Sequence, residues 1–237
     1  MNVIGKDIGT ALDKLYEQIE RRVRVEAERA LRVEAFEGGA TSNVSWQEEG
    51  AVVISLHSGV PKHALPHVFG VALHHVRQRL DRYPDVARPP AQQPEGAALV
   101  RQALRGLLLE PEAEMQLEAL DLDREWEVEQ RHQVLKDLLR EPPGEWQEVG
   151  TIGNHFLALQ YAKFALLHPP EMWDALRKSI RETVPAAAQR GELALGIVRQ
   201  YGWGGPGACL ESMVGVRNAM ELGGLALVED RRSGELL

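Results

Sequence analysis

The chain has 237 residues, of which 44% are hydrophobic, so it is long enough to bury a hydrophobic core. Its formal net charge of −8 argues against broad binding to nucleic acid or to an anionic membrane, because surfaces that bind either are usually basic. No run approaches the roughly 18–20 apolar residues that span a bilayer, and the N-terminus has no apolar signal-peptide stretch. A single cysteine, Cys209, excludes an intramolecular disulfide and a cysteine-based zinc cluster. These features predict a soluble, cytoplasmic protein, and the predominance of Arg over Lys indicates a bacterial source.

The N-terminal part is expected to form one long helix. Apolar residues recur at three- and four-residue steps from Ile8 to Ala27, and no proline interrupts residues 7–36. Such a helix of about thirty residues would be roughly 45 Å long, which exceeds the diameter of about 30 Å of a small domain. The rest of the chain can cover only part of its apolar stripe, and a second copy of the chain can cover the remainder. The sequence therefore predicts a homodimer through this helix.

A β-hairpin is predicted next. The hydrophobic pattern changes to one typical of strands at residues 44–46 and 51–56. These two segments flank Glu48, Glu49 and Gly50, and Gly50 can adopt the positive φ of the turn. Its apolar face is expected to pack on the following helix through Val76. No other strand is expected except a short one at residues 225–228.

The remaining segments are predicted to be helical, at about residues 66–83, 97–109, 111–140, 151–167, 170–183, 186–201 and 208–222. Four prolines predict an exposed loop or lid at residues 84–96. The Pro142-Pro143-Gly144 stretch is the best candidate boundary, and it divides the chain into 1–141 and a C-terminal helical subdomain, 142–237. The predicted fold class is therefore α+β and predominantly α-helical, with a long N-terminal helix, a small β-hairpin and a helical body.

A histidine cluster lies around the first of these helices, since five of the eight histidines fall between residues 57 and 75: His57, His63, His67, His74 and His75. Neutral imidazole is the commonest metal ligand in proteins, so the cluster suggests a metal site. However, His67 and His74 would lie about 10 Å apart along a helix, too far to share one zinc ion. The four-residue spacing of His63 and His67 is more compatible with a shared metal ion, although Pro66 disfavours a continuous helix between them. The favoured interpretation is that His67, His74 and Gln78 form a solvated helix face or line a cleft.

The order of hairpin, histidine-bearing helix and carboxylate-bearing helix over about residues 44–120 resembles the zincin metallopeptidases. In that family a strand precedes a helix carrying His-Glu-x-x-His, and a later helix often supplies a third ligand. The resemblance matches His74 to the first ligand, and it puts His75 at the position of the general-base Glu and Gln78 at that of the second His. Because only one of three motif residues is retained, it implies a degenerate zincin that binds or regulates rather than cleaves.

A third zincin ligand would come from the acidic stretch between residues 110 and 129. The resemblance matches Glu114 to it, with Glu112 and Glu118 as rivals. The candidate metal ligands are therefore His63, His67, His74 and Glu114, and the metal would be zinc or another divalent cation. The acidic stretch as a whole is otherwise typical of a solvated helix face.

A glycine-rich segment, residues 202–207, precedes a helix that has Cys209 near its start. Glycines before a helix N-terminus can hold an anion, and the helix dipole can activate a cysteine. A lone cysteine among apolar neighbours is more typical of a small core residue.

Three functions remain open. The first is a zincin-like, non-catalytic core that binds a macromolecular partner or a small ligand, without a cofactor and without stoichiometric zinc. The second is a metal-dependent hydrolase with a non-standard His/Glu site. The third is a helical assembly or scaffold protein that uses the N-terminal helix.

Overall fold

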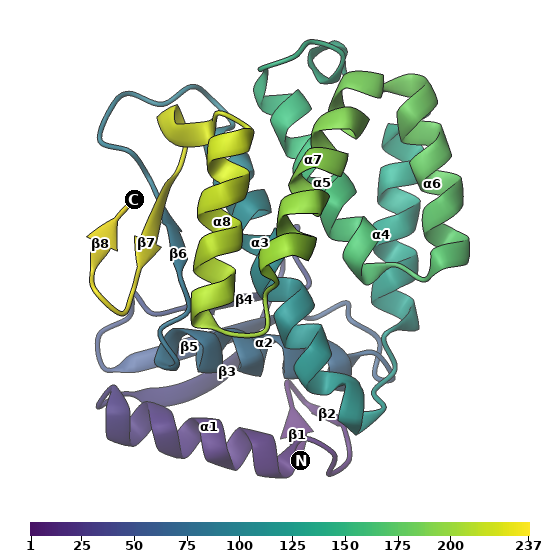
Figure 1. The fold of residues 1–237 in the computed structure, drawn as a ribbon. Helices are drawn as coiled ribbons and strands as arrows, with labels where there is room; N and C mark the ends of the chain where they lie inside the picture. Colours follow the sequence, from purple (N-terminus) through teal and green to yellow (C-terminus); the bar gives the residue numbers. More distant parts are fainter. The chain divides into compact units, whose positions relative to one another are not determined.

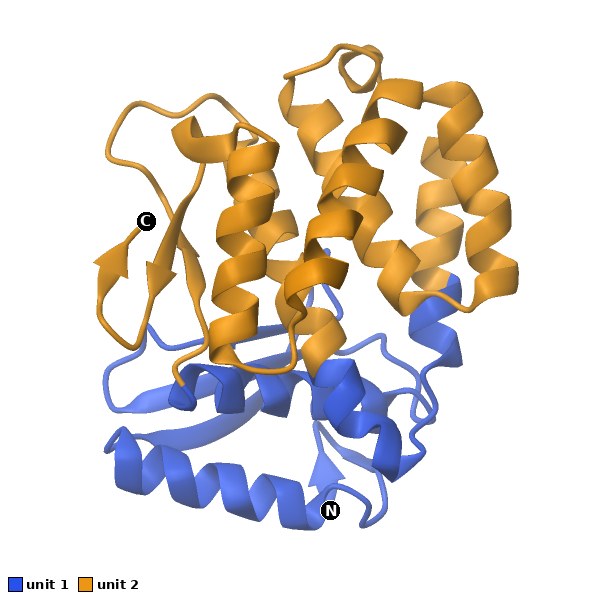
Figure 2. Ribbon diagram, viewed as in Figure 1, with its two compact units in different colours: residues 1–81, 113–129 blue, residues 82–112, 130–237 orange.

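A computed structural model describes residues 1–237 and divides them into two compact units (Figures 1 and 2). Unit 1 contains residues 1–81 and 113–129, and unit 2 contains residues 82–112 and 130–237. The chain thus passes from unit 1 to unit 2 after residue 81 and returns to unit 1 for residues 113–129, called the excursion below. From residue 130 on it stays in unit 2. The boundary predicted at residue 142 lies inside unit 2. The fold is α+β and mainly helical with eight α-helices, which confirms the predicted fold class.

Unit 1 is built on a three-stranded sheet with the order β3-β5-β4, formed by β3 (Ala30–Phe36), β4 (Ser42–Ser45) and β5 (Ala51–His57). The central strand, β5, runs parallel to β3 and antiparallel to β4. Helices α1 (Asp13–Glu26) and α2 (Leu65–Leu80) contact each other and the sheet (Figure 1). A short ribbon of β1 (Asn2–Val3) and β2 (Lys6–Asp7) completes the N-terminal part.

The predicted hairpin is confirmed by β4 and β5, and Gly50 has the expected positive φ of 69°. Val52, Ile54 and Leu56 of β5 share one core with Val76 of α2, as predicted. The strand is buried on its other face too, since every residue from 51 to 56 is buried. This near-continuous burial is typical of a central strand with a parallel neighbour.

The long N-terminal helix predicted for residues 7–36 is wrong. Helix α1 has only 14 residues, and the chain leaves it through Glu28, whose φ of 55° is left-handed. Residues 30–36 form β3 instead, with alternating half-buried and exposed side chains for most of its length. Leu31 and Val33 face inward between Arg32 and Glu34, a two-residue period that fits a strand better than a helix. The apolar stripe of α1 belongs to the core of unit 1 through Ile19 and Val23, so the overhang that suggested a dimer does not exist.

Unit 2 contains a helical bundle of α5 (Ile152–Leu167), α6 (Pro170–Thr183), α7 (Pro185–Tyr201) and α8 (Pro206–Ala219). Helix α7 contacts the other three (Figure 1). Gly191 permits the close approach of α7 to α5, because a Cβ there would lie 2.6 Å from the Tyr161 ring. The core of this unit is separate from that of unit 1.

A small antiparallel sheet also belongs to unit 2, with the order β6-β7-β8. Its strands are β6 (Asp85–Ala87), β7 (Leu227–Asp230) and β8 (Glu235–Leu236). The prediction of an exposed loop or lid at residues 84–96 is therefore wrong for residues 85–87, which are half-buried and form β6. The partner strand lies about 140 residues away, and no local pattern reveals the pairing. The short strand expected at residues 225–228 is confirmed in part by β7.

Helices α3 (Ala97–Leu117) and α4 (Glu125–Leu138) each contribute residues to both units. A break was predicted near Pro111, but α3 continues through it, since buried apolar residues on both sides hold the helix in place. The chain turns only after residue 117, through a 3-10 turn (Glu118–Leu120) and a left-handed Asp121. None of the helices is long and apolar enough to cross a membrane.

Candidate functional site

His67 lies near the start of α2 and is held between two carboxylates of unit 1. Its Nε2 is 2.8 Å from Oε2 of Glu114 on α3, and its Nδ1 is 2.5 Å from Oε2 of Glu127 on α4. The His67 side chain is 3% exposed, and the two glutamates are 11% and 12% exposed. Thr41 donates a further hydrogen bond to the second oxygen of Glu127. One imidazole ring therefore joins α2 to both helices of the 113–129 excursion.

The environment of His67 fixes its protonation state. Burial lowers its pKa, but the hydrogen bonds and charges of Glu114 and Glu127 outweigh burial and raise the pKa to about 9. At neutral pH both ring nitrogens then carry protons, and each donates to one carboxylate. A doubly protonated ring has no lone pair for a metal, because histidine must be deprotonated at the nitrogen that binds one.

The geometry of this group also opposes a shared cation. Glu114 and Glu127 lie at different nitrogens of the same ring, on its two sides, so one ion cannot contact all three side chains. No group of three or more His, Cys, Asp or Glu residues is arranged to hold a metal ion. The group formed by Glu114, His67 and Glu127, called the clasp below, is suited to holding helices together by charge.

The other histidines of α2 make local contacts. Arg77 donates from Nε to Nδ1 of His74 at 2.9 Å and also pairs with Asp81. Nδ1 of His75 lies 2.8 Å from Oε1 of Gln78, so the protonated nitrogen donates to the amide oxygen. These contacts turn the side chains along the helix surface.

The four predicted metal ligands are thus placed differently. The structure brings His67 and Glu114 together, whereas His63 is exposed in the turn before α2 and His74 lies about two turns further along the helix. Of the two rivals to Glu114, Glu118 is exposed, and Glu112 is buried and accepts a hydrogen bond from the Tyr83 hydroxyl. The metal set remains a prediction.

The histidine face of α2 is buried, which corrects the expectation of a solvated face. His67 is 2% exposed, His74 5% and Gln78 1%. The polar side chains tolerate burial because each has a hydrogen-bonding partner. For His67 the partners come from residues 47 and 60 positions away, and no spacing within the helix could reveal them. Glu127 was consequently missed as a site residue, since it looked like one more charge in an acidic stretch.

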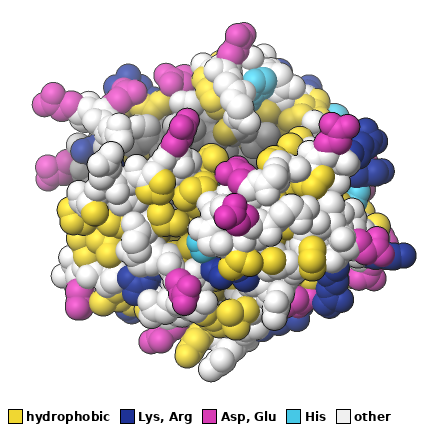
Figure 3. Space-filling model, turned by 90° about the horizontal axis from the view of Figure 1, so that it is seen from above, with side chains coloured by type: hydrophobic (Ala, Val, Ile, Leu, Met, Phe, Trp, Pro, Cys, Tyr) yellow, Lys and Arg dark blue, Asp and Glu magenta, His cyan; other side chains and the backbone are white.

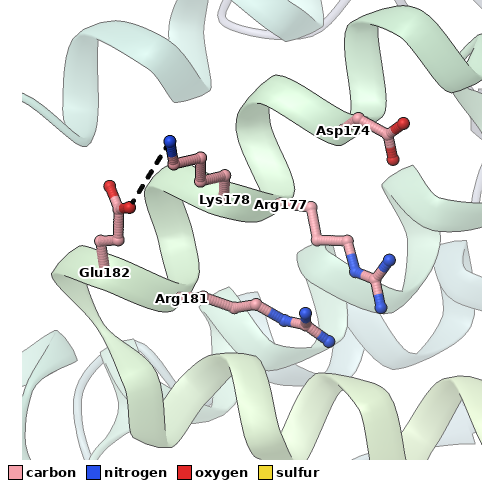
Figure 4. Close-up of a pocket in the computed structure, with 5 residues that line it drawn as sticks. All are labelled: Asp174, Arg177, Lys178, Arg181 and Glu182. Atoms are coloured by element: carbon pink, nitrogen blue, oxygen red, sulfur yellow. Dashed lines mark ion pairs between the residues drawn. The ribbon is translucent and has the colours of Figure 1, made fainter.

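Unit 2 has an open groove of about 380 Å³ on α6. Five charged residues line it: Asp174, Arg177, Lys178, Arg181 and Glu182. Figure 4 shows Lys178 and Glu182 paired on one side, while Arg177 and Arg181 extend the other way. Both of these arginines bind Glu192 of α7, which also accepts from Tyr161.

The five side chains that line the groove are all charged, three positively and two negatively, and their aliphatic stems supply most of its surface. Small-molecule sites are mostly enclosed apolar clefts with a few placed polar groups, so this open groove between charged side chains is not typical of one. On the face seen in Figure 3, acidic and basic side chains are likewise interspersed among apolar ones. A surface of this kind produces no single strong field of one sign.

The glycine-rich segment and Cys209 serve the core of unit 2. The cysteine is fully buried in α8, and its thiol donates to the carbonyl oxygen of Trp203. Ser212 similarly donates to the carbonyl of Gly202. The interpretation of Cys209 as a small core residue is therefore confirmed.

Comparison with models of protein families, with curated proteins and with solved structures finds no match for the chain. Function is therefore inferred from the residues and their geometry.

Proposed function

We propose that this chain is a non-catalytic binding protein whose unit 1 is a zincin-like core. The observation that carries the proposal is the clasp, in which Glu114 is engaged by the imidazolium of His67. The order of sheet, histidine-bearing α2 and a glutamate from a later helix follows the zincin resemblance, but the histidine that meets Glu114 is His67 and not His74, which the resemblance matches to the first ligand. Where a zincin would join these elements through a metal, here a protonated histidine supplies the positive charge.

The residues at the motif positions support the absence of catalysis. A zincin needs two neutral histidines to hold zinc and a glutamate to deprotonate the bound water. His75 and Gln78 stand at two of these positions and bond to each other, and His74 accepts from the cation Arg77. A positive side chain so close to His74 opposes the binding of a dication.

The bound species is proposed to be a protein rather than a small molecule. The α6 groove is open and lined by charges of both signs, which suits a polar protein segment with complementary charges better than a buried apolar ligand. Lys178 is the lining residue best suited to a test, because Arg177 and Arg181 also bind Glu192 inside the unit.

Metal analysis of protein purified without an affinity-metal step tests the non-catalytic core. We expect well below one equivalent of zinc and no peptidase turnover. Near one equivalent of tightly bound zinc, lost in His74→Ala and retained in the control His57→Ala, would overturn the proposal. That outcome would favour the metal-dependent hydrolase instead.

Quantitative affinity capture tests the groove. A partner that binds there should be retained by the wild-type chain, lost from Lys178→Glu, and retained by the control Lys14→Glu on the exposed face of α1. Equal capture by all three chains would remove the groove from the proposal.

We also propose that the protein acts in the cytoplasm of a bacterium, where its one buried cysteine stays reduced. A homodimer remains a prediction, although the length of the N-terminal helix no longer supports it. Light scattering at micromolar concentration distinguishes a dimer from a monomer of 26.4 kDa.

A further inference from the structure

Another buried histidine, His168 of unit 2, lies in surroundings opposite to those of the clasp. His168 is the residue that ends α5, and it is 6% exposed. Neither of its ring nitrogens has a hydrogen-bond partner. Its ring packs on Phe164, with 4.6 Å between centroids, and faces His132 of α4 at 6.0 Å. Nδ1 of His132 is also buried without a partner.

The charged groups near this pair are mainly positive. Lys163 on α5 and Arg131 on α4 both act on His168, and both pair with Glu110 of α3, at 2.9 Å and 3.7 Å. The first acidic residue of α6, Glu171, is exposed. Lys136 of α4 acts on His132 as well, so the pair of histidines has three cations against one carboxylate, and two of these cations engage that carboxylate.

This arrangement keeps the ring neutral. Burial, followed by the charges of Arg131, His132 and Lys163, lowers the pKa of His168 to about 4. Burial and Lys136 lower the pKa of His132 in the same direction. A proton on His168 would be a buried charge with no acceptor, a state that proteins avoid by exposing the group to water.

We propose that His168 and His132 form an acid-sensitive latch, which holds the end of α5 against α4 at neutral pH and releases it in mild acid. Because His168 is buried and its ring faces His132 of α4, we expect its exposure to water to require that residues 164–168 move away from α4, which couples protonation to local opening. The latch adds a pH-controlled state of unit 2 to the binding role proposed above, and it does not depend on that role.

Hydrogen exchange followed by mass spectrometry tests the latch on the full chain, at pH 7.5 and pH 5.5, after correction for intrinsic exchange rates. If the opened histidine titrates near 6.5 and the closed one near 4, the opening equilibrium should rise about tenfold at pH 5.5. We expect this loss of protection in peptides from residues 131–139 and 164–172, and not in β5 of unit 1.

His168→Leu should remove the pH dependence, since it fills the site without a titratable group, and the matched control His63→Leu should leave it unchanged. A loss of protection below twofold in the wild-type chain, or a tenfold loss that persists in His168→Leu, would overturn the proposal. If His168→Leu does not fold, NMR titration of the wild-type histidines decides. A His168 ring that titrates below pH 5 supports the latch, and one that titrates near pH 6.5 in the folded protein refutes it.

Discussion

The proton on His67 should make a large contribution to the stability of unit 1. The pKa of His67 is about 9 in the folded protein, compared with an ordinary value of 6.5. A group whose pKa is raised on folding stabilises most at pH values below its unfolded pKa, and this contribution disappears as the pH rises through the folded pKa. The difference corresponds to about 3 kcal/mol in all, of which about 2.5 kcal/mol is still present at pH 7.

The perturbation that tests this magnitude is His67→Gln, which keeps a polar side chain but cannot carry the charge. It removes the positive charge that Glu114 and Glu127 share across the ring, so we expect a loss of about 3 kcal/mol at pH 7. The stability of unit 1 is best followed by hydrogen exchange of the β5 and α2 amides, because two units need not unfold in one transition. The free energy of unfolding of unit 1 should fall by about 3 kcal/mol between pH 6 and pH 9.5 in the wild type. In the variant it should be nearly constant over the same range.

The exposed His63, in the turn before α2, supplies the matched control. His63→Gln should retain the full pH dependence. If wild type and His67→Gln instead lose stability with the same slope above pH 7, the imidazolium does not hold the clasp and the reasoning is refuted.

Three further predictions concern packing. Val76→Asp should unfold unit 1 or lower its melting temperature sharply, because an unpaired carboxylate in a fully buried position costs several kcal/mol, and an unchanged thermal transition would contradict the placement of α2. Gly191→Ala should destabilise unit 2 by about 1–3 kcal/mol in a urea titration through its clash with Tyr161, whereas Gly196→Ala on the same helix has open space and should gain up to about 1 kcal/mol. Glu192→Gln should weaken the contacts of α6 with α7, since it removes the charge that both groove arginines share, and exchange of the α6 amides should increase.

The elements that the sequence predicted well are those whose signals are local. Helices α5, α6 and α7 begin and end within about two residues of their predicted bounds, because their start signals and their apolar periodicity act over a few residues. These start signals are the Thr151 cap of α5 and the prolines at the starts of α6 and α7. The hairpin was likewise marked by its change of period and by Gly50.

The elements that were missed depend on partners far along the chain. Strand β3 pairs with β5 across some twenty residues, and β6 pairs with β7 across some 140. The alternation in residues 30–36 favours a strand, but it is too short to exclude a continuation of the helix, and the pairing with β5 that completes the strand lies outside the local sequence. The clasp was missed for the same reason, because its residues are far apart in the sequence. Glu114 and Glu127 reach His67 only because residues 113–129 return to unit 1.

Two of the buried histidines show why residue type and burial together still leave the protonation state open. His67 and His168 are nearly equally buried, and in both cases burial is the largest influence and favours the neutral ring. Two carboxylates reverse that preference at His67, whereas two cations reinforce it at His168. One ring is therefore charged and the other neutral at pH 7, and acid and alkali act on different units. Alkali should loosen the clasp of unit 1, and acid should loosen the latch of unit 2. Near neutral pH we therefore expect His67 to hold unit 1 closed as a cation and His168 to hold unit 2 closed as a neutral ring.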